Sequence, residues 1–108
     1  MTKSQQDALQ RLQQWYTSHC NGGWEHNSVI KIESMDNPGW HVSVDIYDTE
    51  LADEDFQLDE KSFDDGRWYR CYIENGKFIA FGGPRQLEEL ITLFLDWAEA
   101  QSTPITAE

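Results

Sequence analysis

Apolar residues recur every three or four positions near both ends of the chain, a spacing that predicts a helix at each end. The first set consists of Ala8, Leu9, Leu12, Trp15 and Tyr16. Ser4, followed three residues later by Asp7, predicts a capping box at the start of this helix. The glycines in Asn21-Gly22-Gly23 predict its end, because glycine tolerates the left-handed backbone of a helix C-cap.

The second helix is expected after Gly82-Gly83-Pro84, with Pro84 at the first helical position. Its apolar stripe consists of Leu87, Leu90, Ile91, Phe94, Leu95, Trp97 and Ala98. The polar tail after Gln101 is expected to fray, which gives an ordered core of about residues 4–101.

Between the helices the pattern changes to the period of two that is typical of half-buried strands. The sheet is expected to start at Trp24-Glu25-His26, and residues 29–47 are predicted to form a hairpin. Its turn is Asp36-Asn37-Pro38-Gly39, where Pro38 and Gly39 predict a type II turn with a positive φ at the glycine. The strand that follows alternates, with Trp40, Val42, Val44 and Ile46 on one face.

Three further strands are predicted. Residues 48–55 are too charged for a central strand, but a strand is expected from Phe56 to Phe63. Residues 67–74 and 77–81 alternate again, and the Asn75-Gly76 pair between them favours a tight hairpin. The predicted order is α-β-β-β-β-β-α: a single α+β domain over residues 1–108, with an antiparallel sheet of about five strands flanked by two helices.

Charge narrows the functions open to such a domain. The 108 residues include 8 Lys and Arg against 20 Asp and Glu, a formal net charge of -12. Nucleic acid and anionic membranes are therefore poor partners, since both need a basic surface. No secretory leader or membrane-spanning run is visible, and two cysteines make no disulfide framework, so we expect a cytoplasmic protein with free thiols.

Candidate catalytic and metal-binding groups are sparse. Cys20, Cys71, His19 and His26 lack the paired spacings of a zinc site, so neither a metal nor another cofactor is expected. A nucleophilic cysteine needs a low thiol pKa and a nearby base, and neither cysteine has that setting in the sequence. The acid–base pairs Glu25 with His26 and Asp45 with His41 are equally weak signals. We expect no enzyme, although a small Cys-dependent sulfurtransferase or hydrolase stays open as an alternative.

The largest anomaly in composition is an acidic stretch in the middle of the chain. Half of all the carboxylates lie there, with Lys61 as the only base: Asp45, Asp48, Glu50, Asp53, Glu54, Asp55, Asp59, Glu60, Asp64 and Asp65. Two interpretations remain open. The stretch is either a solvated loop and edge that resists aggregation, or a docking surface for a basic partner, whose association it would accelerate.

Several short motifs resemble the immunity protein 53 family over about residues 9–99. They are Trp15-Tyr16 with Cys20, Trp24-Glu25-His26, Asp36-Asn37-Pro38-Gly39-Trp40, a strand containing Asp45, and Gly82-Gly83-Pro84 with the Leu-Glu-Glu helix after it. Asn27-Ser28 departs from the family pattern, in which a glycine is expected nearby. Trp15, Trp24, Glu25, Pro38, Gly39, Trp40, Gly82, Gly83 and Pro84 are interpreted as structural members of these motifs.

The resemblance implies a bacterial cytoplasmic antidote that binds a cognate toxin domain and needs no turnover. Toxins that act on nucleic acid are usually basic, so the acidic residues 48–60 are the hypothetical interface, with Tyr47 or Phe56 as an aromatic anchor. The predicted partner-binding residues are Tyr47, Asp48, Glu50, Asp53, Glu54, Asp55, Phe56, Asp59 and Glu60. A monomer is favoured. An acidic adaptor or nucleic-acid mimic for some other basic protein is the remaining alternative.

Overall fold

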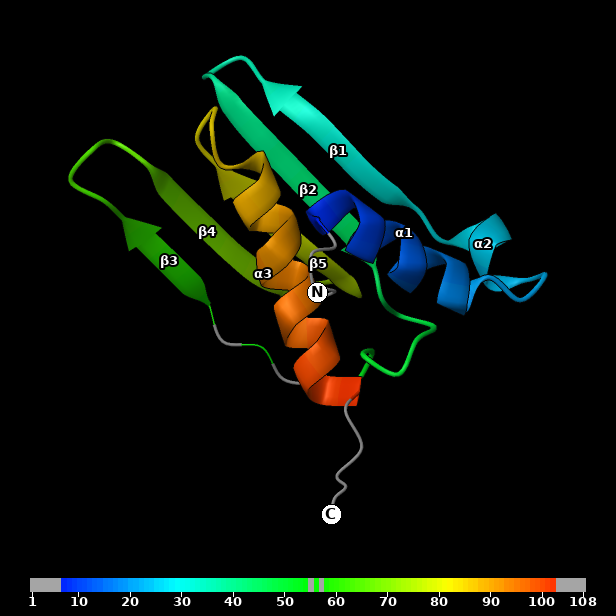
Figure 1. The fold of residues 1–108 in the computed structure, drawn as a ribbon. Coiled ribbons are helices and arrows are strands. Elements are labelled where there is room, and N and C mark those ends of the chain that lie inside the picture. Colours follow the sequence, from blue (N-terminus) through cyan, green and yellow to red (C-terminus); the bar gives the residue numbers. More distant parts are fainter. Residues whose placement is uncertain (1–6, 55, 57, 103–108) are drawn as a thin grey trace, which may run out of the picture.

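The computed structural model describes residues 7–54, 56 and 58–102. It shows an antiparallel five-stranded sheet with helices on one face (Figure 1). The helices are α1 (Ala8–His19), α2 (Trp24–Asn27) and α3 (Leu87–Ser102); the strands are β1 (Ile30–Met35), β2 (Gly39–Asp45), β3 (Asp59–Ser62), β4 (Trp68–Glu74) and β5 (Lys77–Gly82). The predicted α+β class and the antiparallel sheet between an N-terminal and a C-terminal helix are confirmed.

Helix α1 begins one turn later than the predicted capping box. Asp7 is the N-cap, and its carboxylate accepts a hydrogen bond of 2.9 Å from the Gln10 amide. Ser4 lies outside the described residues. The buried face is also narrower than expected, because Leu9 is 59% exposed and Tyr16 is 38% exposed.

Residues 24–27 form the short helix α2, so the expectation that Trp24-Glu25-His26 starts the sheet is wrong. The Glu25 carboxylate holds the preceding turn by accepting hydrogen bonds from the amides of Asn21 (3.0 Å) and Gly22 (2.9 Å). These bonds fix the turn that leads into α2, and the sheet begins only at Ile30.

The strands lie in the order β1-β2-β5-β4-β3, and every neighbouring pair is antiparallel. The predicted hairpin over residues 29–47 is present as β1 and β2, with Ile32 opposite Val42. The strand predicted from Phe56 to Phe63 is shorter, Asp59–Ser62. Residues between β2 and β3 must pass two strands to reach the far edge of the sheet, which keeps most of that segment out of the ladder.

The turn between β1 and β2 differs from the predicted type II turn. Gly39 has no positive φ; it is the first residue of β2, and it is required by a close approach. A Cβ at this position would lie 2.5 Å from the carbonyl oxygen of Gly82 on β5. The hairpin predicted at Asn75-Gly76 has the expected backbone, with φ values of 55° and 75°.

Helix α3 begins at Leu87, three residues after Pro84, so the prediction of Pro84 at the first helical position is wrong. Pro84 lies in a turn that is closed by a hydrogen bond of 3.0 Å from the Gln86 amide to the Gly83 carbonyl. Much of the predicted apolar stripe of α3 is buried against the sheet: Leu90, Ile91, Phe94, Leu95 and Ala98. On β5, Phe78 meets this stripe, with its ring centroid 5.1 Å from that of Phe94.

The two faces of the sheet are therefore different. Helices α1 and α3 cover one face, where Val42, Val44 and Cys71 are buried (Figure 1). On the opposite face, called the open face below, His41 stacks on Phe81 with ring centroids 4.7 Å apart. In the order of the strands, β1 and β3 are the two edges of the sheet.

Candidate functional site

The acidic segment, defined here as residues 48–60, is a structured connection between β2 and β3. Its first part is a series of turns, with hydrogen bonds of 3.1 Å from Thr49 N to Ile46 O, from Ala52 N to Thr49 O and from Glu54 N to Leu51 O. The Thr49 hydroxyl donates to Ile46 O at 2.8 Å and accepts from the Leu51 amide at 3.0 Å. The segment thus has a defined backbone from which its carboxylates project.

Leu51 fastens this segment to the core. It is 0% exposed and belongs to the cluster that contains Phe78 and Phe94. Asp48, Asp53 and Glu54 on either side are exposed. Leu51 is not among the residues predicted from the sequence. A signal for it is present, however, since Leu51 is the only large aliphatic residue between Ile46 and Leu58.

A second contact ties the segment to the end of α1. His19 Nε2 lies 2.8 Å from Glu50 Oε1, and His19 Nδ1 lies 2.8 Å from the carbonyl oxygen of Trp15. Burial raises the pKa of Glu50, but the hydrogen bond from His19, a backbone hydrogen bond and the His19 charge outweigh it and leave that pKa lowered. Glu50 is therefore a positioned carboxylate, and the pairing joins two segments that are distant in sequence.

The predicted aromatic anchors lie in different surroundings. Tyr47 is 44% exposed, and its hydroxyl donates a hydrogen bond of 2.6 Å to the carbonyl oxygen of Asn27. The Phe56 ring packs edge-on against Phe78 and Trp97, with centroids 5.3 Å from each. Phe56 is therefore part of the packing beneath the segment, and Tyr47 is the aromatic side chain that remains available to a partner.

The predicted carboxylates also divide between surface and interior. Asp48, Glu50, Asp53, Glu54 and Glu60 are exposed, whereas Asp55 lies outside the described residues. Asp59 is half-buried and shares the helix-covered face with Cys71 and Tyr69, whose hydroxyl lies 3.4 Å from Asp59 Oδ1. Five carboxylates among the described residues of the segment are therefore exposed.

The motif residues form two structural clusters. Near α2, Trp15 makes edge contacts with Trp24 (5.7 Å) and Phe94 (4.9 Å). At the far end of the sheet, the Trp40 indole donates a hydrogen bond of 3.0 Å to the carbonyl oxygen of Pro84. The first cluster joins the three helices, and the second joins β2 to the turn before α3.

The two glycines beside Pro84 pack closely. A Cβ on Gly82 would lie 3.0 Å from side-chain atoms of Gln86 and Leu90, and one on Gly83 would lie 3.4 Å from Trp68 Nε1. The turn residue Pro38 is exposed between β1 and β2. Gly82 and Gly83 are thus closely packed, and the structural role of the motif residues stays a prediction.

A model of one protein family, described as immunity protein 53, matches residues 9–99. The chain belongs to the immunity protein 53 family. The matched residues run from α1 to α3 and include both packing clusters described above. Comparison with curated proteins found no match, and comparison with solved structures found none.

The cysteines of this immunity protein 53 member lie in unlike settings. Cys71 is buried in the sheet, and burial, with the nearby Asp59 charge, raises the pKa of its thiol to about 12. A thiol with that pKa stays protonated at neutral pH and is a poor nucleophile. Cys20 is exposed at the end of α1, where its thiol donates to the Tyr16 carbonyl oxygen at 3.3 Å.

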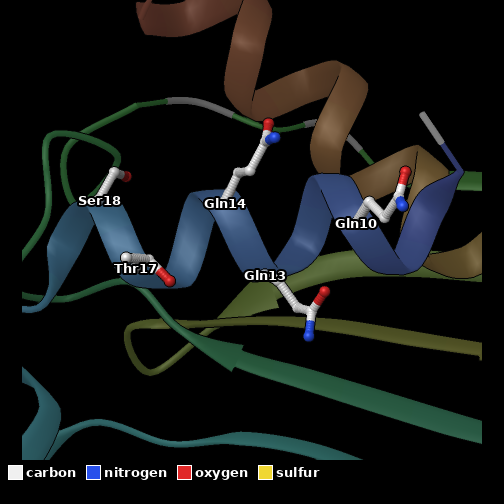
Figure 2. Close-up of a pocket in the computed structure, with 5 residues that line it drawn as sticks. All are labelled: Gln10, Gln13, Gln14, Thr17 and Ser18. Carbon is white, nitrogen blue, oxygen red and sulfur yellow. The ribbon is translucent and has the colours of Figure 1, made fainter. Parts of the chain in front are cut away.

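The hollows of the described surface differ in their chemistry. One runs along α1 and is lined by Gln10, Gln13, Gln14, Thr17 and Ser18, whose side chains are all uncharged (Figure 2). Another, on the open face, is lined by charged or titratable side chains that include Lys31, His41 and Asp45. Among the described residues, no group of three or more His, Cys, Asp and Glu is arranged to hold a metal ion. None of the described helices is long and apolar enough to cross a membrane.

Proposed function

We propose that this protein neutralises a bacterial toxin domain by binding it through the exposed part of the acidic segment. Membership of the immunity protein 53 family is the observation that carries the role. The site is supported by Asp48, Asp53 and Glu54, which project from a backbone that Leu51 fixes to the core.

The charge of the segment indicates a basic partner. The whole chain carries a net charge of -12, and the carboxylates of the segment have Lys61 as their only basic neighbour in sequence. A basic toxin such as a nuclease presents the complementary field, which accelerates encounter and disfavours unrelated acidic partners. Tyr47 provides an aromatic group beside these charges, a combination that is common at the centre of protein interfaces.

The alternative of a Cys-dependent enzyme has less support. Cys71 has a raised thiol pKa, and no described His side chain is hydrogen-bonded to either cysteine. Iodoacetamide labelling of Cys71 at neutral pH tests this alternative, since a catalytic thiolate alkylates quickly and a protonated buried thiol does not.

The direct test is co-purification with a candidate toxin domain from the same genome, followed by binding isotherms at low and high salt. We expect one-to-one binding that weakens as salt rises. The triple variant Asp48→Asn/Asp53→Asn/Glu54→Gln should weaken binding by at least about tenfold.

The matched control is Asp36→Asn/Glu74→Gln/Glu88→Gln, which removes the same number of exposed carboxylates from other parts of the surface. It should leave affinity within about threefold of the wild type, since dispersed rim charges contribute little. Absence of toxin binding by the folded protein would refute the proposed role. If the affinity changes neither with salt nor in the triple variant, the acidic site is refuted, but the role in neutralising a toxin is not.

A further inference from the structure

The two edges of the sheet are protected very differently. Strand β3 is only four residues long and reads Asp-Glu-Lys-Ser, so shortness and charge both discourage pairing with another strand. Strand β1 has six residues, and in Figure 1 none of the described helices or strands lies beyond its outer edge. It also exposes an apolar side chain, Ile32, which is 39% accessible. The β1 edge therefore keeps the capacity to pair that β3 has lost.

The hydrogen-bond pattern of β1 shows which of its backbone groups point outward. Asp45 N donates to Val29 O at 3.1 Å, so the directly opposite residues 29 and 45 are a hydrogen-bonded pair. Because such pairs alternate along an antiparallel ladder, Lys31, Glu33 and Met35 also direct their backbone groups toward β2. The amides and carbonyls of residues 30, 32 and 34 then point away from the sheet.

This pattern is complementary to a second copy of the same strand. In an antiparallel pair centred on Ile32, residue 32 lies opposite itself and Ile30 lies opposite Ser34. All of these are outward-pointing residues, so they form the hydrogen-bonded pairs that the ladder needs. The same register places Lys31 of each copy opposite Glu33 of the other, on the open face of the extended sheet.

Neighbouring registers lack this match. Moving the centre to residue 31 places two Lys31 side chains opposite each other, and moving it to residue 33 does the same with two Glu33 side chains. Like charges directly opposite across strands are destabilising, whereas opposite charges stabilise the pair. Lys31 and Glu33 are both exposed, and the one ion pair of Glu33 in the described structure is a 3.5 Å contact with His41.

The helix-covered face of the same edge adds apolar surface. A hollow between α1 and the start of β1 is lined by Leu12, Tyr16, Val29 and Ile30, among others, and Val29 is 48% exposed. Two Ile32 side chains would meet on this face at the centre of the register above. Exposed apolar groups beside an unpaired strand are typical of an interaction surface.

We propose that β1 pairs with β1 of a second copy, in the register centred on Ile32, to form a symmetric dimer with a continuous ten-stranded sheet. A dimer replaces the monomer that the sequence favours. The acidic segment ends at β3, the edge opposite β1, although it starts beside β1, where the Tyr47 hydroxyl donates to the Asn27 carbonyl oxygen. The inference does not rest on the proposed toxin binding, and sedimentation of the chain alone can overturn it.

Sedimentation velocity over a concentration series measures the dimer directly. The wild type should approach twice the 12.6 kDa mass of one chain as concentration rises. Lys31→Glu and Glu33→Lys each place like charges at both cross-strand positions, so each alone should raise the dimer dissociation constant by more than about tenfold. Mixing these two variants restores opposite charges at both positions and should restore a dimer, as should the double variant Lys31→Glu/Glu33→Lys.

The matched controls are Lys61→Glu and Glu60→Lys on β3, which make the same changes in net charge at the other edge. They should dimerise like the wild type. A wild type that stays monomeric throughout the series overturns the proposal, as does a mixture of the two β1 variants that fails to associate. If the wild type is monomeric and Lys31→Glu lowers its affinity for the toxin, the β1 edge binds the toxin, and the pairing of two copies is refuted.

Discussion

Truncation of Leu51 to alanine tests whether one buried side chain holds the acidic segment in place. Leu51 is 0% exposed, so the substitution removes its side chain from a fully packed site. Three carbon groups at about 0.8 kcal/mol each correspond to about 2.4 kcal/mol of lost burial. The cavity left behind adds to this, and the total should be about 3–4 kcal/mol.

Urea unfolding followed by tryptophan fluorescence measures this loss as a change in the free energy of unfolding. Domains of this size usually have about 5–15 kcal/mol of stability, so the variant should remain folded at low temperature. Its melting temperature should fall by roughly 10–20 °C. With the anchor gone, the turns that carry Asp53 and Glu54 lose their attachment, so toxin affinity should also fall in the folded variant.

The control is Leu58→Ala, because Leu58 belongs to the same segment but is 52% exposed. Truncation of that side chain should cost less than about 1 kcal/mol. A Leu51→Ala variant that loses under about 1 kcal/mol would show that the segment is held by its turns alone. Equal losses in the two variants would contradict the assignment of Leu51 as the anchor.

Three further predictions concern other parts of the chain. Gly39→Ala should destabilise the fold by about 2 kcal/mol or more in urea unfolding, since its Cβ would lie 2.5 Å from a backbone oxygen of β5. An aromatic disulfide reagent at neutral pH should modify the exposed Cys20 quickly and Cys71 only after unfolding, because the Cys71 thiol has a pKa of about 12. Since the folded pKa of Glu50 is lowered, its contribution is present above the ordinary value of 4.5 and lost as pH falls through the folded value. In Glu50→Gln, the melting temperature should therefore fall less steeply as pH is lowered than in the wild type. An unchanged dependence of the melting temperature on acid pH would contradict the stabilising role of the Glu50 carboxylate.

The strands could be predicted because their alternation marks the face that packs against the helices, although Ser43 and Asp45 on the opposite face of β2 are buried as well. The residues Val42, Val44 and Ile46 are buried as expected, and Asn75-Gly76 adopts the predicted turn. Such signals are local: each depends on residues within one strand or one turn, so the sequence alone contains them.

The features that could not be predicted depend on contacts between distant residues. Gly39 is required by a carbonyl of β5, although its position after a proline suggests a local turn. Helix α2 depends on Glu25, which holds the preceding turn, and on the packing of Trp24 against Trp15. Asp59 was expected at the surface, yet strand pairing turns its side chain toward Cys71.

The acidic segment should respond to salt in opposite ways in the free protein and in the complex. Asp48, Asp53 and Glu54 lie close in sequence on one exposed loop, so their mutual repulsion opposes folding. Screening by salt should therefore raise the stability of the free protein while weakening its binding to a basic toxin. The same carboxylates cause both salt effects. Asp48→Asn/Asp53→Asn/Glu54→Gln should therefore reduce the salt dependence of stability and the salt dependence of binding together. If only the binding became insensitive to salt, repulsion within the segment would be too weak to affect folding, and its charge would matter at the interface alone.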